Sequence, residues 1–152
     1  MKAVEIYTDG ACSGNPGNGG WAAILKYKEI QKEISGSEPK TTNNRMELFA
    51  VINALNELKE ECEVSIFSDS RYVIDSVERG WLEKWQSNGW RTSTGKEVKN
   101  QDLWLQLVAQ SQFHKLKLVK VPAHADNELN NRCDALAKNA AEMLGKITNN
   151  KK

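Results

Sequence analysis

The sequence predicts an α/β protein in which helices pack on a mixed β-sheet. Residues 3–8 alternate between polar and apolar positions, as strands with one buried face do, and two further strand-like segments follow within the first forty residues. From Asn44 the apolar spacing changes to the helical period, and β-rich segments then alternate with helical ones. The 152 residues suit one compact domain with its own core.

Three strands are expected in the N-terminal part. Residues 3–8 (AVEIYT) are β-rich, and Asp9-Gly10 is expected to end this strand before the turn-rich segment SGNPGNGG. Residues 20–27 resume as a strand, and 30–37 form a third. Together they predict an antiparallel meander.

The rest of the chain mixes helices and strands. A helix is expected from Asn44 to Lys59, because its apolar residues form one stripe. The further expected elements are a strand at 63–68, a helix at 71–79, a Trp-rich segment to about 91, a helix at 100–112, a strand at 114–121 and a helix at 128–144. Residues 1–144 therefore form the predicted single domain, and 145–152 a polar tail that frays.

Composition excludes several classes of protein. Apolar residues make up 39% and charged residues 27%, as in ordinary soluble proteins, and the net charge of +1 shows no overall attraction to polyanions. No run of about 18 apolar residues and no secretory signal is visible, so we expect no membrane contact. Three cysteines without metal spacing favour a reducing cytoplasm. No long apolar stripe requires a partner, which makes a monomer the expectation.

Four acidic residues are candidates for chemistry. Asp9 and Asp69 follow the first and fourth strands, Glu47 lies in the first turn of the first helix, and Asp134 lies in the last helix. If those two strands are neighbours, Asp9 and Asp69 emerge side by side. Each acid also has a purely structural explanation. These are a turn at Asp9-Gly10, a capping box between Asn44 and Glu47, an N-cap at Asp69, and an ion pair between Asp134 and Lys138.

Convergence of these carboxylates would require cations. Two carboxylates about 4 Å apart repel by roughly 4 kcal/mol at an effective dielectric constant near 20. An all-oxygen ligand set favours Mg²⁺, with Mn²⁺ as the alternative, over zinc. Two such ions support phosphoryl chemistry, in which one activates water and the other stabilises the leaving oxygen.

Four strings of residues carry a family resemblance. YTDGACSGNPGNGG (7–20), TTNNRMEL (41–48), FSDSRYV (67–73) and AHADNELNNRCDALA (123–137) resemble bacterial ribonuclease H of type 1. The similarity extends from about residue 3 to 141 and includes the Trp-rich insert and VKNQDLW (98–104). Any one of these strings alone would be weak, but four in this order are specific.

The resemblance implies a fold, an activity and a set of site residues. The fold is the ribonuclease H-like fold, a five-stranded mixed sheet flanked by helices. The activity is endonucleolytic hydrolysis of the RNA strand of an RNA–DNA hybrid with two Mg²⁺ ions, leaving 5′-phosphate and 3′-hydroxyl ends. The family's catalytic and metal-binding carboxylates fall on Asp9, Glu47, Asp69 and Asp134. Its loop histidine, which assists proton transfer or product departure, falls on His124, although a lone His in a polar loop is usually an exposed bystander. Asp126 stands where relatives often have Gly or Asn, so the position of His124 relative to the scissile phosphate stays open.

The resemblance also implies how the hybrid is bound. Polar side chains suit a minor groove that displays 2′-hydroxyls. The family's minor-groove residues fall on Asn15, Asn43, Asn44 and Arg71, and its pocket for a DNA phosphate on Thr42 and Asn100. The alternative for the asparagines is that they only cap helices and form turns. His114 matches no motif and is expected to have no functional role.

The insert at 79–99 concentrates positive charge. Five basic and two acidic residues give it +3, against +1 for the whole chain, and tryptophans are interleaved with them. Trp81 is the tryptophan most expected to contact nucleic acid, while Trp85 and Trp90 also suit a small core. Gln86, Ser87 and Asn88 stand where some relatives carry a basic run, which predicts weaker and less salt-sensitive binding.

Three competing hypotheses remain open. The chain could bind hybrids without catalysis, but such a binder gains nothing from four repelling acids. It could be a nuclease that acts on structured DNA, which the TTNN segment and Asn15 disfavour by similarity. It could also be a structural α/β domain in which every acid is a cap or a surface pair.

Overall fold

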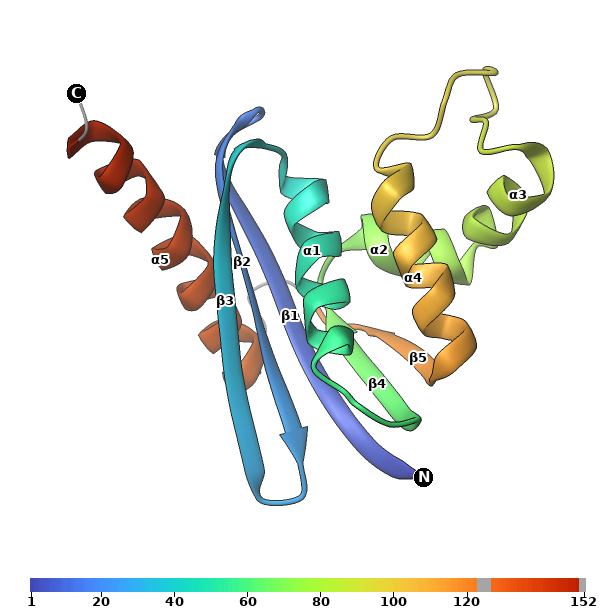
Figure 1. Ribbon diagram of the computed structural model, residues 1–152, viewed down its shortest axis with the longest axis horizontal. Coiled ribbons are helices and arrows are strands. Elements are labelled where there is room, and N and C mark those ends of the chain that lie inside the picture. Colours follow the sequence, from blue (N-terminus) through green and yellow to red (C-terminus); the bar gives the residue numbers. More distant parts are fainter. Residues whose placement is uncertain (123–126, 151–152) are drawn as a thin grey trace.

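The computed structural model describes residues 1–122 and 127–150, with side chains up to residue 147. It confirms the α/β fold, with a five-stranded mixed sheet between helices (Figure 1). The strands are β1 (Lys2–Gly14), β2 (Gly17–Tyr27), β3 (Ile30–Thr41), β4 (Cys62–Ser68) and β5 (Lys115–Lys120). Their order across the sheet is β3-β2-β1-β4-β5. The first three form the expected antiparallel meander, and β4 and β5 continue the sheet in parallel with β1.

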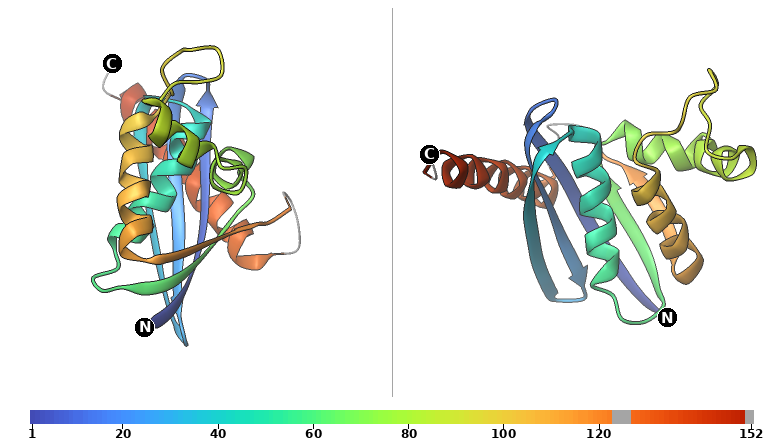
Figure 2. Two further views of the ribbon diagram at one scale, coloured as in Figure 1. Left: turned by 90° about the vertical axis from the view of Figure 1, so that its right-hand side faces the viewer. Right: turned by 45° about the horizontal axis from the view of Figure 1, so that its top comes forward.

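Helices cover both faces of this sheet. They are α1 (Asn43–Asn56), α2 (Arg71–Glu78), α3 (Trp81–Asn88), α4 (Gln101–Phe113) and α5 (Glu128–Asn150). Figure 2 shows α1 and α4 on one side of the sheet and α5 on the other. The helix α1 packs on β1 and β2, whereas α5 packs across β1, β2 and β3. No helix in the described ranges has both the length and the apolar character needed to cross a membrane.

Each face has its own apolar core, because successive strand residues point to opposite sides. Val4 and Ile6 of β1 face the core beneath α1 and α4, which also holds the fully buried Trp104. Tyr7 faces the core beneath α5, where it meets Cys133 and Ala137. The strand β1 is therefore buried from both sides and is the natural place for a fixed functional residue.

Several expected boundaries were wrong, three of them by four residues or more. The strand β1 does not end at Asp9-Gly10, because its pairing with β2 continues to Gly14 opposite Gly17. The strand β3 runs four residues beyond the predicted end at residue 37, to Thr41. The last helix does not stop before residue 145 and continues to Asn150, so six residues of the predicted tail are helical. Ladder pairing and a continued helix are decided by neighbouring chain segments, which local composition does not reveal.

Candidate active site

Parallel pairing of β1 with β4 brings two of the four acids together. Tyr7 pairs with Phe67, so Asp9 and Asp69, each two residues further on, lie at the same level of the sheet. Asp9 lies within β1, whereas Asp69 directly follows the last residue of β4. This confirms that the first and fourth strands are neighbours.

Glu47 reaches the same place because helix α1 lies unusually close to β1. One carboxylate oxygen of Glu47 accepts a hydrogen bond from the backbone N–H of Gly10, at 3.0 Å. A β-carbon on Gly10 would lie only 2.6 Å from the backbone nitrogen of Glu47. Gly10 is therefore needed for close approach between strand and helix rather than for a turn.

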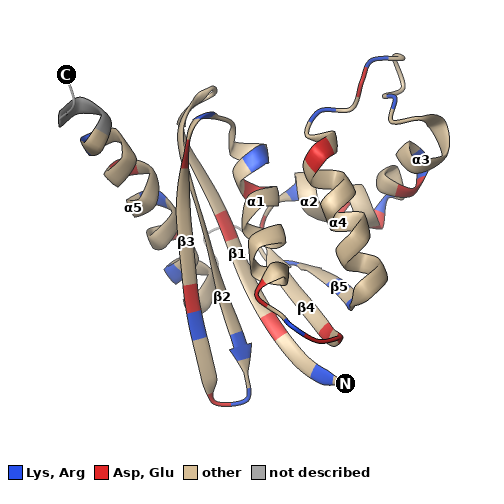
Figure 3. Ribbon diagram, in the orientation of Figure 1, with Lys and Arg blue, Asp and Glu red and all other residues tan. Residues whose placement is uncertain are grey.

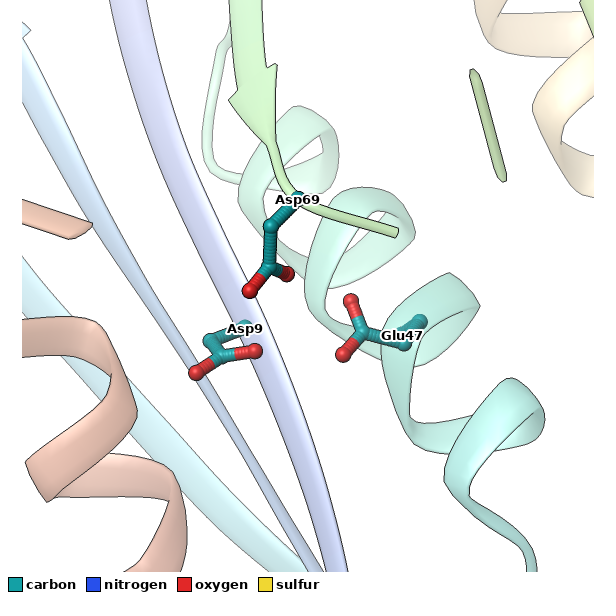
Figure 4. A group of neighbouring side chains, drawn as sticks. All are labelled: Asp9, Glu47 and Asp69. Atoms are coloured by element: carbon teal, nitrogen blue, oxygen red, sulfur yellow. The ribbon is translucent and has the colours of Figure 1, made fainter. Parts of the chain in front are cut away.

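The three carboxylates point toward one another from β1, from α1 and from just beyond the end of β4 (Figure 4). One oxygen from each of Asp9, Glu47 and Asp69 lies within 4.8 Å of the other two. Asp134 of α5 lines the same cavity, and its carboxylate forms an ion pair with Lys138 at 3.0 Å. Four acids far apart in the sequence thus meet at one site.

Burial makes this cluster electrostatically costly. Asp9 is 7% exposed and Glu47 is 4% exposed. Loss of hydration, followed by repulsion from Asp69, raises the pKa of Asp9 to about 7. Burial, followed by repulsion from Asp9, raises the pKa of Glu47 well above its usual range. A bound cation would remove both penalties, and hard oxygen donors suit Mg²⁺ or Mn²⁺.

Three of the four structural explanations for the acids were wrong. Asp9 lies inside a strand, α1 is capped by Thr42 rather than Asn44, and α2 is capped by Ser70 rather than Asp69. The ion pair between Asp134 and Lys138 is confirmed, and it coexists with a place beside the other acids. The hypothesis that every acid is a cap or a surface pair is therefore contradicted.

Several residues that were predicted to bind the substrate surround this cluster. Asn43, Asn44 and Arg71 line the same cavity as the carboxylates. Asn15 lies next to them, since its side-chain oxygen accepts from the N–H of Asn43 at 3.4 Å. The predicted phosphate-binding pair, Thr42 and Asn100, precedes α1 and α4, respectively.

The remaining predicted residues lie elsewhere. Trp81 begins α3 and lines a separate groove with Lys84 and Arg91. His124 lies outside the described residues, as does Asp126. His114 is buried and its Nδ1 accepts from the N–H of Cys62 at 3.1 Å, which gives it a structural contact.

Two groups of residues near the site were not predicted from the sequence. Arg45 binds both Asn100 and Asp102, more than fifty positions away, and no local pattern signals such a pairing. Asn127, Asn130 and Asn131 line a small cavity against Asp9, Asp69 and Asp134. The sequence did carry a signal for this second group, because three asparagines precede Asp134 just before and within the first turn of the predicted last helix.

Comparison with known proteins agrees with this geometry. The family model described as RNase H matches residues 1–142. A protein named Ribonuclease H from Acetivibrio thermocellus is 60% identical over 137 residues, covering 90% of this chain and 93% of the relative. Another from Thermoanaerobacter sp. (strain X514) is 61% identical, covering 90% and 88%.

Solved structures share the fold. LC9-RNase H1, a type 1 RNase H, superposes with a TM-score of 0.83 and 30% identity, covering 93% of this chain and 73% of its own. LC11-RNase H1, solved in complex with an RNA/DNA hybrid, has a TM-score of 0.67 and covers 93% and 98%. At 24% identity, that second likeness concerns the fold alone.

Proposed function

The chain belongs to the ribonuclease H family, and on that premise we propose that it hydrolyses the RNA strand of RNA–DNA hybrids as an endonuclease. The observation that carries the proposal is the meeting of Asp9, Glu47 and Asp69, with Asp134 on the same cavity. A protein that only binds hybrids has no use for this electrostatic cost. Catalysis through bound cations, in contrast, needs such a cluster of carboxylates.

We propose that these four residues hold two Mg²⁺ ions when the hybrid is bound, with Mn²⁺ as a substitute. The donor set fits, since it consists of carboxylate oxygens and includes one buried oxygen of Glu47 without a hydrogen-bond partner among the described residues. Bound ions would supply an activated water and stabilise the leaving oxygen. Attack of that water oxygen on phosphorus, with cleavage of the bond to the 3′ oxygen, leaves the proposed 5′-phosphate and 3′-hydroxyl ends.

The chain's own residues prepare this site. Gly10 holds Glu47 in place through its N–H, and Lys138 holds Asp134. Because burial and repulsion raise the pKa of Asp9 to about 7, a cation that binds near neutral pH competes with a proton at this carboxylate. His124 is proposed to assist proton transfer or product departure, on the family resemblance.

Recognition of the hybrid is proposed to use the polar rim of the cavity. Asn15, Asn43, Asn44 and Arg71 would read the minor groove by shape and by 2′-hydroxyls. Thr42 and Asn100 would bind a phosphate of the DNA strand, and Trp81 would pack on the hybrid from the insert. A monomeric state, a cytoplasmic location and a domain boundary at residue 144 stay predictions.

One experiment tests the activity. Wild type and Asp69→Asn are incubated with labelled RNA–DNA hybrid, duplex RNA and duplex DNA, with Mg²⁺ and with chelator. We expect metal-dependent cutting of the hybrid's RNA strand alone, reduced at least about a hundredfold in Asp69→Asn. Glu63→Gln is the matched control, because Glu63 is an exposed acid at the other end of β4.

The other outcomes distinguish the competing hypotheses. Hybrid binding by the wild type without cutting would indicate a binding module, and cutting of duplex DNA would indicate another substrate. A thermal melt must show that Asp69→Asn folds. Removal of one like charge from the cluster is expected to preserve or raise stability without metal.

A further inference from the structure

Arg45 joins the N-terminal ends of two helices beside the site. It lies in the first turn of α1, and its Nη1 donates to the side-chain oxygen of Asn100 at 3.2 Å. The same guanidinium donates two further hydrogen bonds to Asp102 in the first turn of α4, at 3.0 and 2.7 Å. Figure 3 shows a basic segment at the start of α1 and an acidic one at the start of α4.

These contacts fix the orientation of the Asn100 carboxamide. Its oxygen accepts from Arg45, and its Nδ2 donates to the hydroxyl of Tyr72 at 3.0 Å. The oxygen and the nitrogen therefore cannot exchange places without losing the bond to Arg45, because a guanidinium only donates, whereas the hydroxyl of Tyr72 can donate or accept. One N–H of Nδ2 remains for an external acceptor.

Helix capping does not account for Asn100. The residue occupies the N-cap position of α4 with φ of 62°, a left-handed conformation that Asn tolerates, but its side chain makes no capping hydrogen bond. Its carboxamide is held by residues of α1 and α2 instead. The backbone role and the side-chain role of Asn100 are thus separable.

The hydroxyl of Thr42 is a second hydrogen-bond donor, and it lies close to Arg45. Its side-chain oxygen accepts from the backbone N–H of Arg45 at 3.2 Å, which leaves the hydroxyl hydrogen free to donate. Thr42 precedes α1 and Asn100 precedes α4, so each donor stands at a helix N-terminus, where anions are favoured.

The charge of Arg45 is already matched by Asp102. The two side chains form a bidentate pair, the geometry in which a planar guanidinium differs most from an ammonium group. A lysine at this position would keep the charge but could not bind Asn100 and both oxygens of Asp102 at once. Arg45 is therefore suited to hold a neighbour in place rather than to attract a phosphate by charge.

We propose that Arg45 is a positioning residue for the DNA strand of the hybrid: its guanidinium orients Asn100 so that the Asn100 carboxamide and the Thr42 hydroxyl both donate to one DNA phosphate. This inference rests on the proposed role of Thr42 and Asn100 in phosphate binding. The competing explanation is that Arg45 and Asp102 merely pin α1 to α4.

The test uses hybrids in which single DNA-strand phosphates are replaced, one position at a time, by uncharged methylphosphonates. For the wild type we expect one position at which the replacement raises KM about tenfold with little change in kcat, the loss of a charge-assisted hydrogen bond. Asn100→Gly keeps the left-handed backbone and removes the carboxamide, and it should abolish that sensitivity.

Two further variants separate positioning from pinning. Asp102→Asn removes the ion pair, and Arg45→Lys removes its bidentate geometry together with the bond to Asn100. In Asp102→Asn the amide oxygen of the asparagine still accepts from Arg45, which keeps its bond to Asn100. Positioning predicts that Arg45→Lys loses the methylphosphonate sensitivity and raises KM about tenfold on the unmodified hybrid, while Asp102→Asn keeps the sensitivity. Equal behaviour of the two variants would overturn the inference.

The failure of the underlying assignment looks different. If Asn100→Gly responds to every methylphosphonate as the wild type does, Asn100 binds no phosphate, and the inference falls with that part of the proposed function. If Asn100→Gly loses the sensitivity to the methylphosphonate but Arg45→Lys keeps it, the phosphate pocket stands and the positioning role of Arg45 is wrong. Thermal melts accompany each variant, and only small shifts are expected because both partners of the ion pair are partly exposed.

Discussion

Asp9 and Glu47 lie almost fully buried beside each other, and both are easier to protonate than ordinary carboxylates. For an acid whose pKa is higher in the folded than in the unfolded state, the folded state binds more protons between the two values. Stability is then greatest below the unfolded value and falls as pH rises toward the folded one. A cation that replaces the proton reverses this loss.

The first prediction concerns metal-free stability. With a pKa of about 7 in the fold and about 3.9 unfolded, ionisation of Asp9 should lower the unfolding free energy by a few kcal/mol between pH 4 and 7. The melting temperature measured in chelator should therefore decrease over this range. In Asp9→Asn the decrease should be smaller, and the variant should be the more stable protein at pH 8.

Addition of Mg²⁺ should stabilise the wild type more at pH 8 than at pH 5, because protons compete with the ion. Glu63→Gln should keep the wild-type pH dependence. A melting temperature in chelator that rises from pH 5 to 7 in the wild type, and equally in Asp9→Asn, would contradict the electrostatic account of the cluster.

At the residue scale, the acids could be found from the sequence while their surroundings could not. Asp9 and Asp69 follow β-rich segments, so their shared sheet edge could be inferred from strand order. Convergence with Glu47 and Asp134 came from the family resemblance alone. Arg45 and Asp102 are 57 positions apart, and nothing in either local sequence indicates that they meet.

At the element scale, glycines decide how closely the helices approach the sheet. A β-carbon on Gly10 would overlap the backbone of α1 at Met46 and Glu47, which cannot move without shifting the helix. Gly145 lies within α5, and a β-carbon there meets only the side chain of Asn18 at an ordinary 3.7 Å. The same substitution should therefore have opposite effects at the two positions.

We expect Gly10→Ala to lower the unfolding free energy by about 2–3 kcal/mol, as overpacking commonly does, and to reduce hybrid cleavage by displacing Glu47. Urea denaturation measures the first effect and a cleavage assay with Mg²⁺ the second. Stability and activity both equal to the wild type would show that α1 and β1 are not in close contact.

Gly145→Ala should instead raise the unfolding free energy by up to about 1 kcal/mol, because alanine favours a helix interior. Denaturation with urea again gives the value. This prediction also tests the helical end of the chain, since the sequence alone suggested a frayed tail from residue 145. A frayed tail would make the substitution neutral.

The elements themselves were largely predictable, because apolar periodicity identifies strands and helices. Their ends were not: β1 continues past Asp9-Gly10 because β2 pairs with it, and α5 continues past residue 144, where Gly145 still lies beside Asn18 of β2. Such boundaries depend on tertiary contacts, which a turn pair or a polar composition does not reveal.

At the scale of the whole molecule, the attraction for nucleic acid has to come from a local charge, since the net charge is only +1. The insert around α3 carries basic residues beside Trp81, which lines a groove with Lys84 and Arg91. Trp85 packs against Trp90 and Trp104, so it helps to hold the insert on the body. The expectation that Trp85 and Trp90 serve a small core agrees with these contacts.

The exposed positions 86–88 set how strongly this insert responds to salt. Gln86 and Ser87 only donate to backbone oxygens of their own helix, whereas Asn88 makes two hydrogen bonds with the backbone of Arg91 that shape the following turn. Gln86→Lys/Ser87→Lys therefore adds charge without disturbing the turn, and Asn88 is best left unchanged.

Each additional lysine that reaches a phosphate should steepen the dependence of log affinity on log salt by about 0.9, so the double variant should steepen it by up to about 2. Binding is measured by titrating labelled hybrid with protein variants that all carry Asp69→Asn, over a range of KCl concentrations.

The control is Glu29→Gln/Gln31→Lys, also combined with Asp69→Asn. It likewise adds two positive charges, but at the hairpin between β2 and β3. If both variants steepen the slope equally, total charge rather than the insert governs binding. If neither does, the positions beside α3 do not approach the phosphates, and the weak basic character of this insert has no bearing on affinity.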